Sequence, residues 1–285
     1  MIQNDFIQQL EQFNLALKKN STELRQGEQK SSHTGHGMVF EDHKKYIPGD
    51  DIRKIDWKAY ARTGDLFIKR FEEEKSITVH ILVDRSSSMD YGNENKYDHA
   101  AKLGLATAYM TSQTNDRFRY SVFSETITDI SSGRRNLKTG ELIETLNQLR
   151  KTPESRIERC ITEYSRRIKN KSLLIVISDF LTDTQQIQQA LERLEGTETL
   201  LVNTLSPQEL NPNMKGDKIL KDPESNSKIR TYLSRKTKNS YQQELQQHTQ
   251  KIEKAAQRHG TQYLQLSTGE PVFENFLQIY DLINT

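Results

Sequence analysis

Two dense apolar segments constrain the fold of this chain more than any other feature. They are SITVHILVD at residues 76–84 and SLLIVISD at residues 172–179. A continuous apolar run of this length is typical of a strand buried on both faces of a parallel sheet. Parallel strands need a crossover connection, usually a helix. Because helical patterns separate the two runs, we predict an α/β fold with a doubly wound, mostly parallel sheet flanked by helices.

The rest of the chain continues this alternation of strands and helices. Apolar spacing predicts further helices near 96–112, 139–150, 156–168, 184–195, 238–258 and from about 271, and further strands at 118–123, 126–130, 199–205 and 262–266. A helix is also predicted over 1–30. Residues 65–71 and 76–84 read as two strands of a β-hairpin across the polar link EEEK.

These elements suggest two domains. Residues 1–75 form an N-terminal extension, with a helix and a motif segment that we expect to pack on the core. Residues 76–285 form the sheet domain, with a polar C-terminal elaboration from about residue 206.

Composition excludes several classes of function. The formal net charge is +2, so the whole chain offers no electrostatic basis for binding nucleic acid. Its one cysteine, Cys160, excludes an internal disulfide framework and a zinc site built on cysteine pairs. No apolar segment reaches the length of a membrane span, and none follows Met1. We therefore expect a cytoplasmic protein without membrane insertion.

Both apolar runs end in an aspartate, Asp84 in the first and Asp179 in the second. Open α/β sheets bind ligands beyond the carboxyl ends of their strands, at the switch point. Ser86 and Ser88 follow Asp84, and side chains two residues apart in an extended segment point the same way. Such oxygen ligands suit a hard cation such as Mg²⁺. An ion with so few carboxylate ligands would accept a carboxylate from a binding partner.

Two other interpretations of these residues stay open. In a structural interpretation, Ser86 or Ser88 caps the next helix and Asp84 accepts hydrogen bonds from nearby backbone amides. Residues 84–88 taken alone favour that structural interpretation, whereas Asp179 at the end of a second strand favours the cation site. In an enzymatic interpretation, Asp84 is the phosphoryl-accepting nucleophile of a haloacid-dehalogenase-like hydrolase. That chemistry uses a second acid two residues on, where this chain has Ser86.

The segment DRSSSM at 84–89 resembles the D-x-S-x-S signature of von Willebrand factor A domains. In that family a metal-ion-dependent adhesion site uses the aspartate and both serines, with a threonine from a later loop and an aspartate after a later strand. Asp179 supplies the later aspartate, and Ser155 stands where threonine is usual. The resemblance thus implies a site for Mg²⁺, or for Mn²⁺ or Ca²⁺, formed by Asp84, Ser86, Ser88, Ser155 and Asp179.

A second resemblance covers nearly the whole chain from residue 30. Residues 35–74 contain a Y-x-P-G-D-D-x-R-x-I-D-W run followed by A-R-x-G-x-L. This stretch is very similar to the segment before the A-like domain in the family catalogued as domain of unknown function 58. TLSPQEL (204–210) and LKDPES (220–225) also match that family. Its members resemble partners of MoxR-type AAA+ ATPases. The resemblance implies a non-enzymatic adaptor that acts with such an ATPase in the assembly or maturation of an unknown client protein.

The long motif gathers charged residues around one tryptophan. The cluster consists of Asp50, Asp51, Arg53, Asp56, Trp57 and Arg62. We predict ion pairs between its aspartates and arginines, together with stacking against the tryptophan ring. The cluster serves either as a docking surface for a partner or ligand, or as a structural clamp that holds the N-terminal extension on the sheet. Asp–Arg pairing around one tryptophan favours the clamp.

Overall fold

The structure is a computed structural model that describes residues 2–3, 5–25, 38–73, 77–90, 95–114, 116–134, 138–149, 155–169, 171–212, 216–221 and 228–284. The chain forms two compact units. The larger comprises Met1–Lys19 and Ile77–Thr285, and the smaller comprises Asn20–Ser76. The larger unit thus holds the sheet and the first part of helix α1 (Asp5–Arg25). That the motif segment packs on this core stays a prediction.

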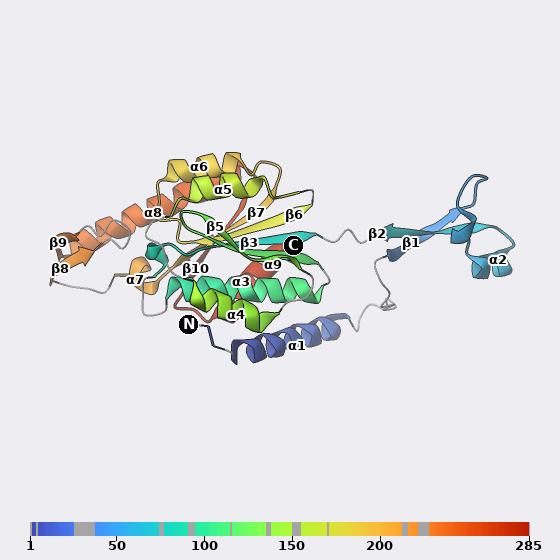
Figure 1. Ribbon diagram of the computed structural model, residues 1–285, viewed down its shortest axis with the longest axis horizontal. Coiled ribbons are helices and arrows are strands. Elements are labelled where there is room, and N and C mark those ends of the chain that lie inside the picture. Colours follow the sequence, from blue (N-terminus) through green and yellow to red (C-terminus); the bar gives the residue numbers. More distant parts are fainter. Residues whose placement is uncertain are drawn as a thin grey trace. The chain divides into compact units, whose positions relative to one another are not determined.

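A six-stranded sheet forms the centre of the larger unit, within the residues described (Figure 1). In spatial order its strands are β10 (Gln262–Ser267), β7 (Glu198–Leu205), β6 (Ser172–Ser178), β3 (Thr78–Asp84), β4 (Arg117–Phe123) and β5 (Ile127–Arg134). Strand β5 pairs antiparallel with β4, whereas the other neighbours pair in parallel. The predicted doubly wound, mostly parallel α/β fold is therefore confirmed.

Helices cover both faces of this sheet (Figure 1). One face packs against α1, α3 (Lys96–Gln113), α4 (Thr139–Gln148) and α9 (Val272–Asn284), and the other against α5 (Ile157–Ser165), α6 (Thr184–Glu192) and α8 (Arg235–Arg258). Successive residues of a strand point to opposite faces. Accordingly, Ile81 and Val83 join one core cluster and Leu82 joins the other. This double burial explains why β3 and β6 are apolar at consecutive positions.

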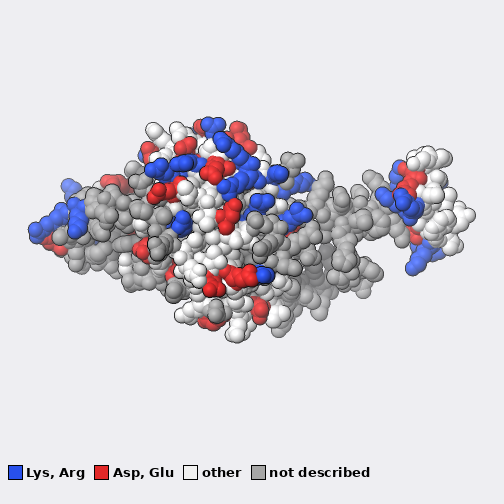
Figure 2. Space-filling view, viewed as in Figure 1, with Lys and Arg blue, Asp and Glu red and all other residues white. Residues whose placement is uncertain are grey.

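The surface of the larger unit carries both signs of charge. On the face shown in Figure 2, basic and acidic side chains are interspersed over α5 and α6, as expected from a formal net charge of +2. Among the described segments, no helix is both long enough and apolar enough to cross a membrane.

One predicted strand pairing is wrong. Residues 65–71 and 76–84 do not form a hairpin, because β2 (Phe67–Glu73) pairs antiparallel with β1 (Met38–Lys45). Strand β3 instead lies between β4 and β6, where its two apolar faces are both covered. The polar segment after residue 206 also contains an antiparallel pair that the apolar pattern did not show, β8 (Gly216–Lys221) with β9 (Lys228–Leu233).

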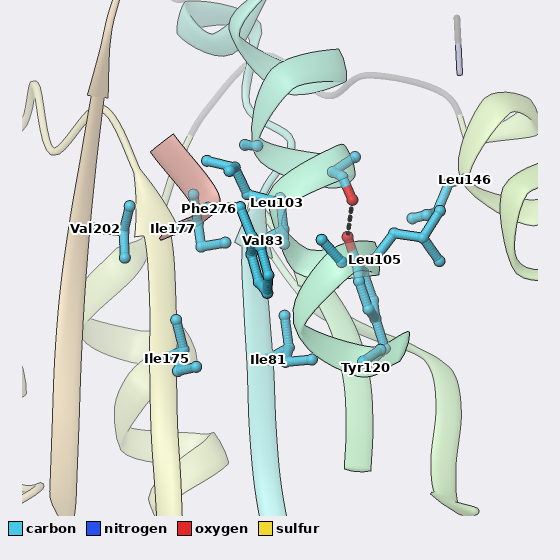
Figure 3. Packing of buried hydrophobic residues seen from close by; sticks show 14 of the residues in the cluster. Ile81, Val83, Leu103, Leu105, Tyr120, Leu146, Ile175, Ile177, Val202 and Phe276 are labelled. Atoms are coloured by element: carbon cyan, nitrogen blue, oxygen red, sulfur yellow. Dashed lines mark hydrogen bonds between the residues drawn. The ribbon is translucent and has the colours of Figure 1, made fainter. Parts of the chain in front are cut away.

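A close contact between α3 and β4 depends on Gly104. A Cβ atom at this position would lie 2.7 Å from the Tyr120 hydroxyl oxygen and 3.0 Å from Cγ2 of Ile81. Tyr120 is fully buried, and its hydroxyl donates a hydrogen bond to the carbonyl of Ala101 at 3.1 Å (Figure 3). The ring therefore has no room to move away from an added methyl group. Helix α3 approaches the sheet closely because residue 104 has no side chain.

Gly104→Ala should destabilise the protein although alanine favours helices. We expect the free energy of unfolding to fall by about 1–3 kcal/mol, because overpacking a buried contact costs more than the gain in helix propensity. Gly140→Ala in α4 is the matched control, since its Cβ would meet no atom within 4 Å. Because Gly140 lies in the first turn of α4, that variant should keep the wild-type stability or gain up to about 0.5 kcal/mol. Urea denaturation of both variants checks this, and equal effects would contradict the close contact.

Candidate metal site

The two strand-end aspartates lie side by side in the sheet. Asp84 is the last residue of β3, and Asp179 directly follows β6, with which β3 pairs in parallel. From β3 the chain runs outward to β4 and β5, and then returns to β6 and runs the other way to β7 and β10. The carboxyl ends of β3 and β6 therefore mark the switch point, where such sheets bind ligands.

Asp84 is buried, with 1% of its surface exposed, and several chain segments donate hydrogen bonds to its carboxylate. Its Oδ1 accepts from the backbone N–H of Ser86 at 2.8 Å. Its Oδ2 accepts from the hydroxyls of Ser155 at 3.1 Å and Ser178 at 2.8 Å. Ser155 lies just before α5, and Ser178 ends β6. The fold thus brings Ser155, predicted from the family resemblance, into contact with Asp84.

A short 3-10 turn, η2 (Ser87–Met89), follows Asp84. Ser86 directly precedes this turn, and Ser88 lies within it. Their hydroxyl oxygens are 3.0 Å apart. Ser86 occupies the N-cap position of this turn, but its side chain makes no capping hydrogen bond. The next helix, α3, is capped by Asn95 instead. The structural interpretation, in which a serine caps a helix and Asp84 binds backbone amides, therefore accounts for the hydrogen bond from the Ser86 amide to Asp84. It does not account for the contact between the Ser86 and Ser88 hydroxyls.

Asp179 contacts a lysine that the sequence analysis did not identify. Lys96 is the first residue of α3 and is fully buried. Its Nζ donates to Asp179 Oδ2 at 2.7 Å and to Glu209 Oε1 at 2.6 Å. Glu209 belongs to the short helix α7 (Pro207–Leu210), which follows β7. The two carboxylates therefore share one buried ammonium group.

Three residues of this cluster were missed for different reasons. Glu209 lies within TLSPQEL, so its family match was a usable signal. Ser178 directly precedes Asp179 and was hidden by its position at the end of an apolar strand. Lys96 had no signal, because a lysine at a helix start is usually solvated.

The environment of the cluster shifts two of its ionisable groups. Burial, and then the nearby charge of Asp179, raises the pKa of the Asp84 carboxyl from 3.8 to about 6. Hydrogen bonds from Ser86 and Ser178 act in the opposite direction, because they stabilise the ionised form. Burial alone would lower the pKa of Lys96, but Asp179 and Glu209 hold it above its ordinary value. Asp84 and Lys96 are therefore both ionised at pH 8.

The donor set at Asp84 fits a hard divalent cation. Mg²⁺, Mn²⁺ and Ca²⁺ take oxygen ligands, and this cluster offers carboxylates and serine hydroxyls. Within the described part of the chain, no three His, Cys, Asp or Glu side chains are placed to hold a metal ion. A metal here would therefore depend on hydroxyls. Ser86, Ser88 and Ser155 would ligate the ion, with Asp84 and Asp179 holding it directly or through water.

The same geometry counts against Asp84 as a phosphoryl-accepting nucleophile. Both of its carboxylate oxygens already accept hydrogen bonds, and the residue is almost fully buried. The hydrolase chemistry also requires a lysine positioned at the reacting group. Lys96 is the buried lysine of this cluster, but it donates to Asp179 and Glu209. The position two residues after Asp84 holds a serine where a second acid is needed.

The motif cluster in the smaller unit makes local contacts. Asp51 pairs with Arg53, as predicted, with Oδ1 and Nε 3.1 Å apart, and caps the 3-10 turn η1 (Ile52–Lys54). Asp50 instead pairs with Lys44 at 3.2 Å. Both aspartates therefore stabilise the turn in which they lie.

The Trp57 ring packs against a tyrosine of its own helix, where stacking of an arginine was predicted. Asp56 caps helix α2 (Trp57–Thr63), accepting hydrogen bonds from two backbone N–H groups of its first turn. The Trp57 ring meets Tyr60 edge-on, with centroids 6.2 Å apart. In a helix, residues three apart share a face whereas residues five apart do not. Among the described residues, the cation–π contacts involve neither Trp57 nor Arg62.

The fold and this site together define an A-like domain of the von Willebrand factor type, with its D-x-S-x-S segment at the switch point of a doubly wound sheet. The profile of the family described as Protein of unknown function DUF58 matches residues 42–251, which is most of the chain. The chain belongs to this family.

Other proteins show more distant similarity. An uncharacterized protein of Mycobacterium bovis is 24% identical over 199 residues, which cover 67% of this chain and 62% of that protein. The matched region is thus less than two thirds of that relative's length. The conserved hypothetical protein BatB of Bacteroides thetaiotaomicron aligns with a TM-score of 0.46 and 15% identity, over 74% of this chain and 100% of that chain. The manganese-loaded TRAP protein of Plasmodium vivax aligns with a TM-score of 0.34 and 16% identity, over 45% of this chain and 57% of that chain.

The raised pKa of Asp84 predicts a specific dependence of stability on pH. Because its folded-state pKa of about 6 lies above the ordinary value of 3.8, the unfolded chain loses this proton first as the pH rises. The contribution of Asp84 to the free energy of unfolding therefore falls between about pH 4 and pH 6. Above that window the buried charge costs about 3 kcal/mol.

Asp84→Asn tests this cost with a side chain of the same shape. Its Oδ1 can still accept from Ser86, and its amide can donate to the Ser155 and Ser178 hydroxyls, which rotate to accept. We expect the variant to gain about 1–3 kcal/mol of unfolding free energy at pH 8 and much less at pH 4. Urea denaturation of both proteins at the two pH values measures this. An equal change at both would show that the Asp84 charge is not costly.

Proposed function

We propose that this chain is a non-enzymatic, metal-dependent protein-binding adaptor. One observation carries the proposal: a buried carboxylate, Asp84, lies at the switch point and takes its hydrogen bonds from an amide and from serine hydroxyls. Because these donors are neutral, the charge of Asp84 stays uncompensated at this point. A divalent cation bound beside Ser86 and Ser88 would compensate it.

The ligand set also indicates what the bound ion would recognise. Hydroxyl ligands carry no charge, so an ion held mainly by Ser86, Ser88 and Ser155 keeps a strong attraction for a further anionic ligand. An aspartate or glutamate side chain of a partner protein supplies such a ligand. We therefore expect the site to capture an acidic residue on a client protein or on an ATPase ring, with Mg²⁺, or Mn²⁺ or Ca²⁺, as the bridge.

Membership of the DUF58 family supports a MoxR-type AAA+ ATPase as the second partner. The adaptor would work with this ATPase in the cytoplasm, in chaperone-like assembly or maturation of client proteins.

The motif segment in the smaller unit supports a docking role alongside its local contacts. It exposes several large apolar side chains, namely those of Ile47 (57%), Ile52 (62%), Trp57 (63%) and Tyr60 (44%). Exposed aromatic residues of this kind are typical anchors of protein interfaces.

Calorimetric titration of Mg²⁺ and Mn²⁺ tests the metal site. We expect binding that Asp84→Ala abolishes. Ser155 provides a matched pair of variants, because threonine and valine have the same shape but only threonine keeps the hydroxyl. Ser155→Thr should bind the ion as the wild-type protein does, whereas Ser155→Val should bind it about tenfold more weakly or worse. If Asp84→Ala binds as tightly as the wild type, the metal lies elsewhere. Equal affinities for the two Ser155 variants would remove only Ser155 from the site.

Partner capture tests the role of the ion. Ser86→Ala combined with Ser88→Ala should abolish divalent-dependent capture of a MoxR-type ATPase and leave the fold intact, because the Ser86 side chain caps no helix and the double variant removes both partners of the Ser86–Ser88 hydroxyl pair together. Ser87→Ala, in the same turn, is the control and should retain capture. The measurement is pull-down at matched Mg²⁺, with and without a chelator, with circular dichroism as the check on folding. Unchanged capture by the double variant would remove the metal from the mechanism.

A further inference from the structure

A buried ion cluster shares Asp179 with the candidate metal site. Lys96 is fully buried, and a lysine in such a position is rare unless it is paired. It binds two carboxylates, Asp179 at 2.7 Å and Glu209 at 2.6 Å. Asp179 directly follows Ser178, whose hydroxyl donates to Asp84 Oδ2 at 2.8 Å. The four groups therefore form one connected set of buried charges.

Glu209 is held in place by its own helix as well as by Lys96. Its Oε2 accepts hydrogen bonds from the backbone N–H of Ser206 at 2.7 Å and from the Ser206 hydroxyl at 2.9 Å, closing a capping box on α7. Pro207 of this helix packs against Gly269 so closely that a Cβ there would lie 2.5 Å from Pro207 Cγ. The carboxylate of Glu209 is thus built into the fold, pointing one oxygen at Lys96.

The formal charges of these four groups sum to a value equal and opposite to the charge of a divalent cation. Asp84, Asp179 and Glu209 are three carboxylic acids and Lys96 is one amine, so the set carries a formal charge of −2 when all four are ionised. Without Glu209, Lys96 would be paired with Asp179 alone and would neutralise it. Because Glu209 shares the ammonium, part of the negative charge of Asp179 is left without a positive partner.

We propose that Glu209 and Lys96 set the charge of the metal site, so that the buried cluster is neutral only when a divalent cation is bound. This inference rests on the proposed metal site at Asp84, and it assigns a role to the TLSPQEL segment. Neither residue ligates the ion. Lys96 positions Asp179, and Glu209 withdraws part of the Lys96 charge from it. The formal charge of the site is thereby matched to a doubly charged ion.

Four proteins separate charge from position. The wild type carries a net cluster charge of −2, Glu209→Gln carries −1, Lys96→Met carries −3, and the double variant Lys96→Met/Glu209→Gln returns to −2. Each is titrated with Mg²⁺ and Mn²⁺ by calorimetry at pH 8, and its thermal unfolding is recorded without metal. We expect Glu209→Gln to bind about tenfold more weakly, since it removes one nearby negative charge in a partly buried site. The double variant should return to within about threefold of the wild-type affinity.

Melting temperatures measured without metal show separately whether each variant folds, so that a loss of binding caused by poor folding is recognised. Lys96→Met leaves two buried carboxylates without their cation, so it should lower the melting temperature strongly, and the double variant should recover part of that loss. Wild-type affinity in Glu209→Gln overturns the inference and leaves the metal site at Asp84 standing. So does a double variant that binds as weakly as Glu209→Gln. Failure of the wild-type protein itself to bind either ion overturns the metal site and this inference together.

Discussion

The parallel pairing of β3 with β6 is the contact on which the candidate site depends. Its register sets Val83 opposite Ile177, so the next residues, Asp84 and Ser178, meet at the end of both strands. The hydrogen bond from Ser178 to Asp84 then joins the two strand ends side chain to side chain. Two residues after Ser178, Phe180 adopts a left-handed conformation with φ of 49°. This conformation costs about 1 kcal/mol, and it is supported by burial of the ring and by His248, which contacts the Phe180 carbonyl at 2.8 Å.

Around this contact the protein buries four ionisable groups, those of Asp84, Lys96, Asp179 and Glu209. Asp84 accepts hydrogen bonds from two serine hydroxyls, and Lys96 donates to two carboxylates, those of Asp179 and Glu209. Buried charges persist only when they are paired and hydrogen-bonded, and apolar replacements of the same volume are often as stable. A local conflict with stability, at a switch point, is the pattern expected of a functional site. The proposed divalent cation resolves the conflict by supplying the missing positive charge.

The two units divide the structural and chemical roles of the chain. The larger unit holds the polar cluster in a rigid sheet whose two faces are covered by helices. The smaller unit is built from short elements, in which Asp51 and Asp56 cap successive turns. Those caps leave the apolar face of Trp57 and Tyr60 exposed, as an interface would need. On the proposed function, one unit holds the ion and the other offers a second surface for docking.

The sequence by itself determined the α/β class, the apolar strands β3 and β6, and the proximity of Asp84 and Asp179. Continuous apolar runs that each end in an aspartate are local signals, and together with the rule that α/β sheets bind ligands at strand ends they were sufficient for these conclusions. The tertiary structure decided the rest. The apolar pattern of 65–71 could not show that β2 pairs with β1, because a strand pattern does not encode its partner. Lys96 and Glu209, 113 residues apart, form a contact with no local signature, since a lysine becomes a buried partner only when the fold removes it from water.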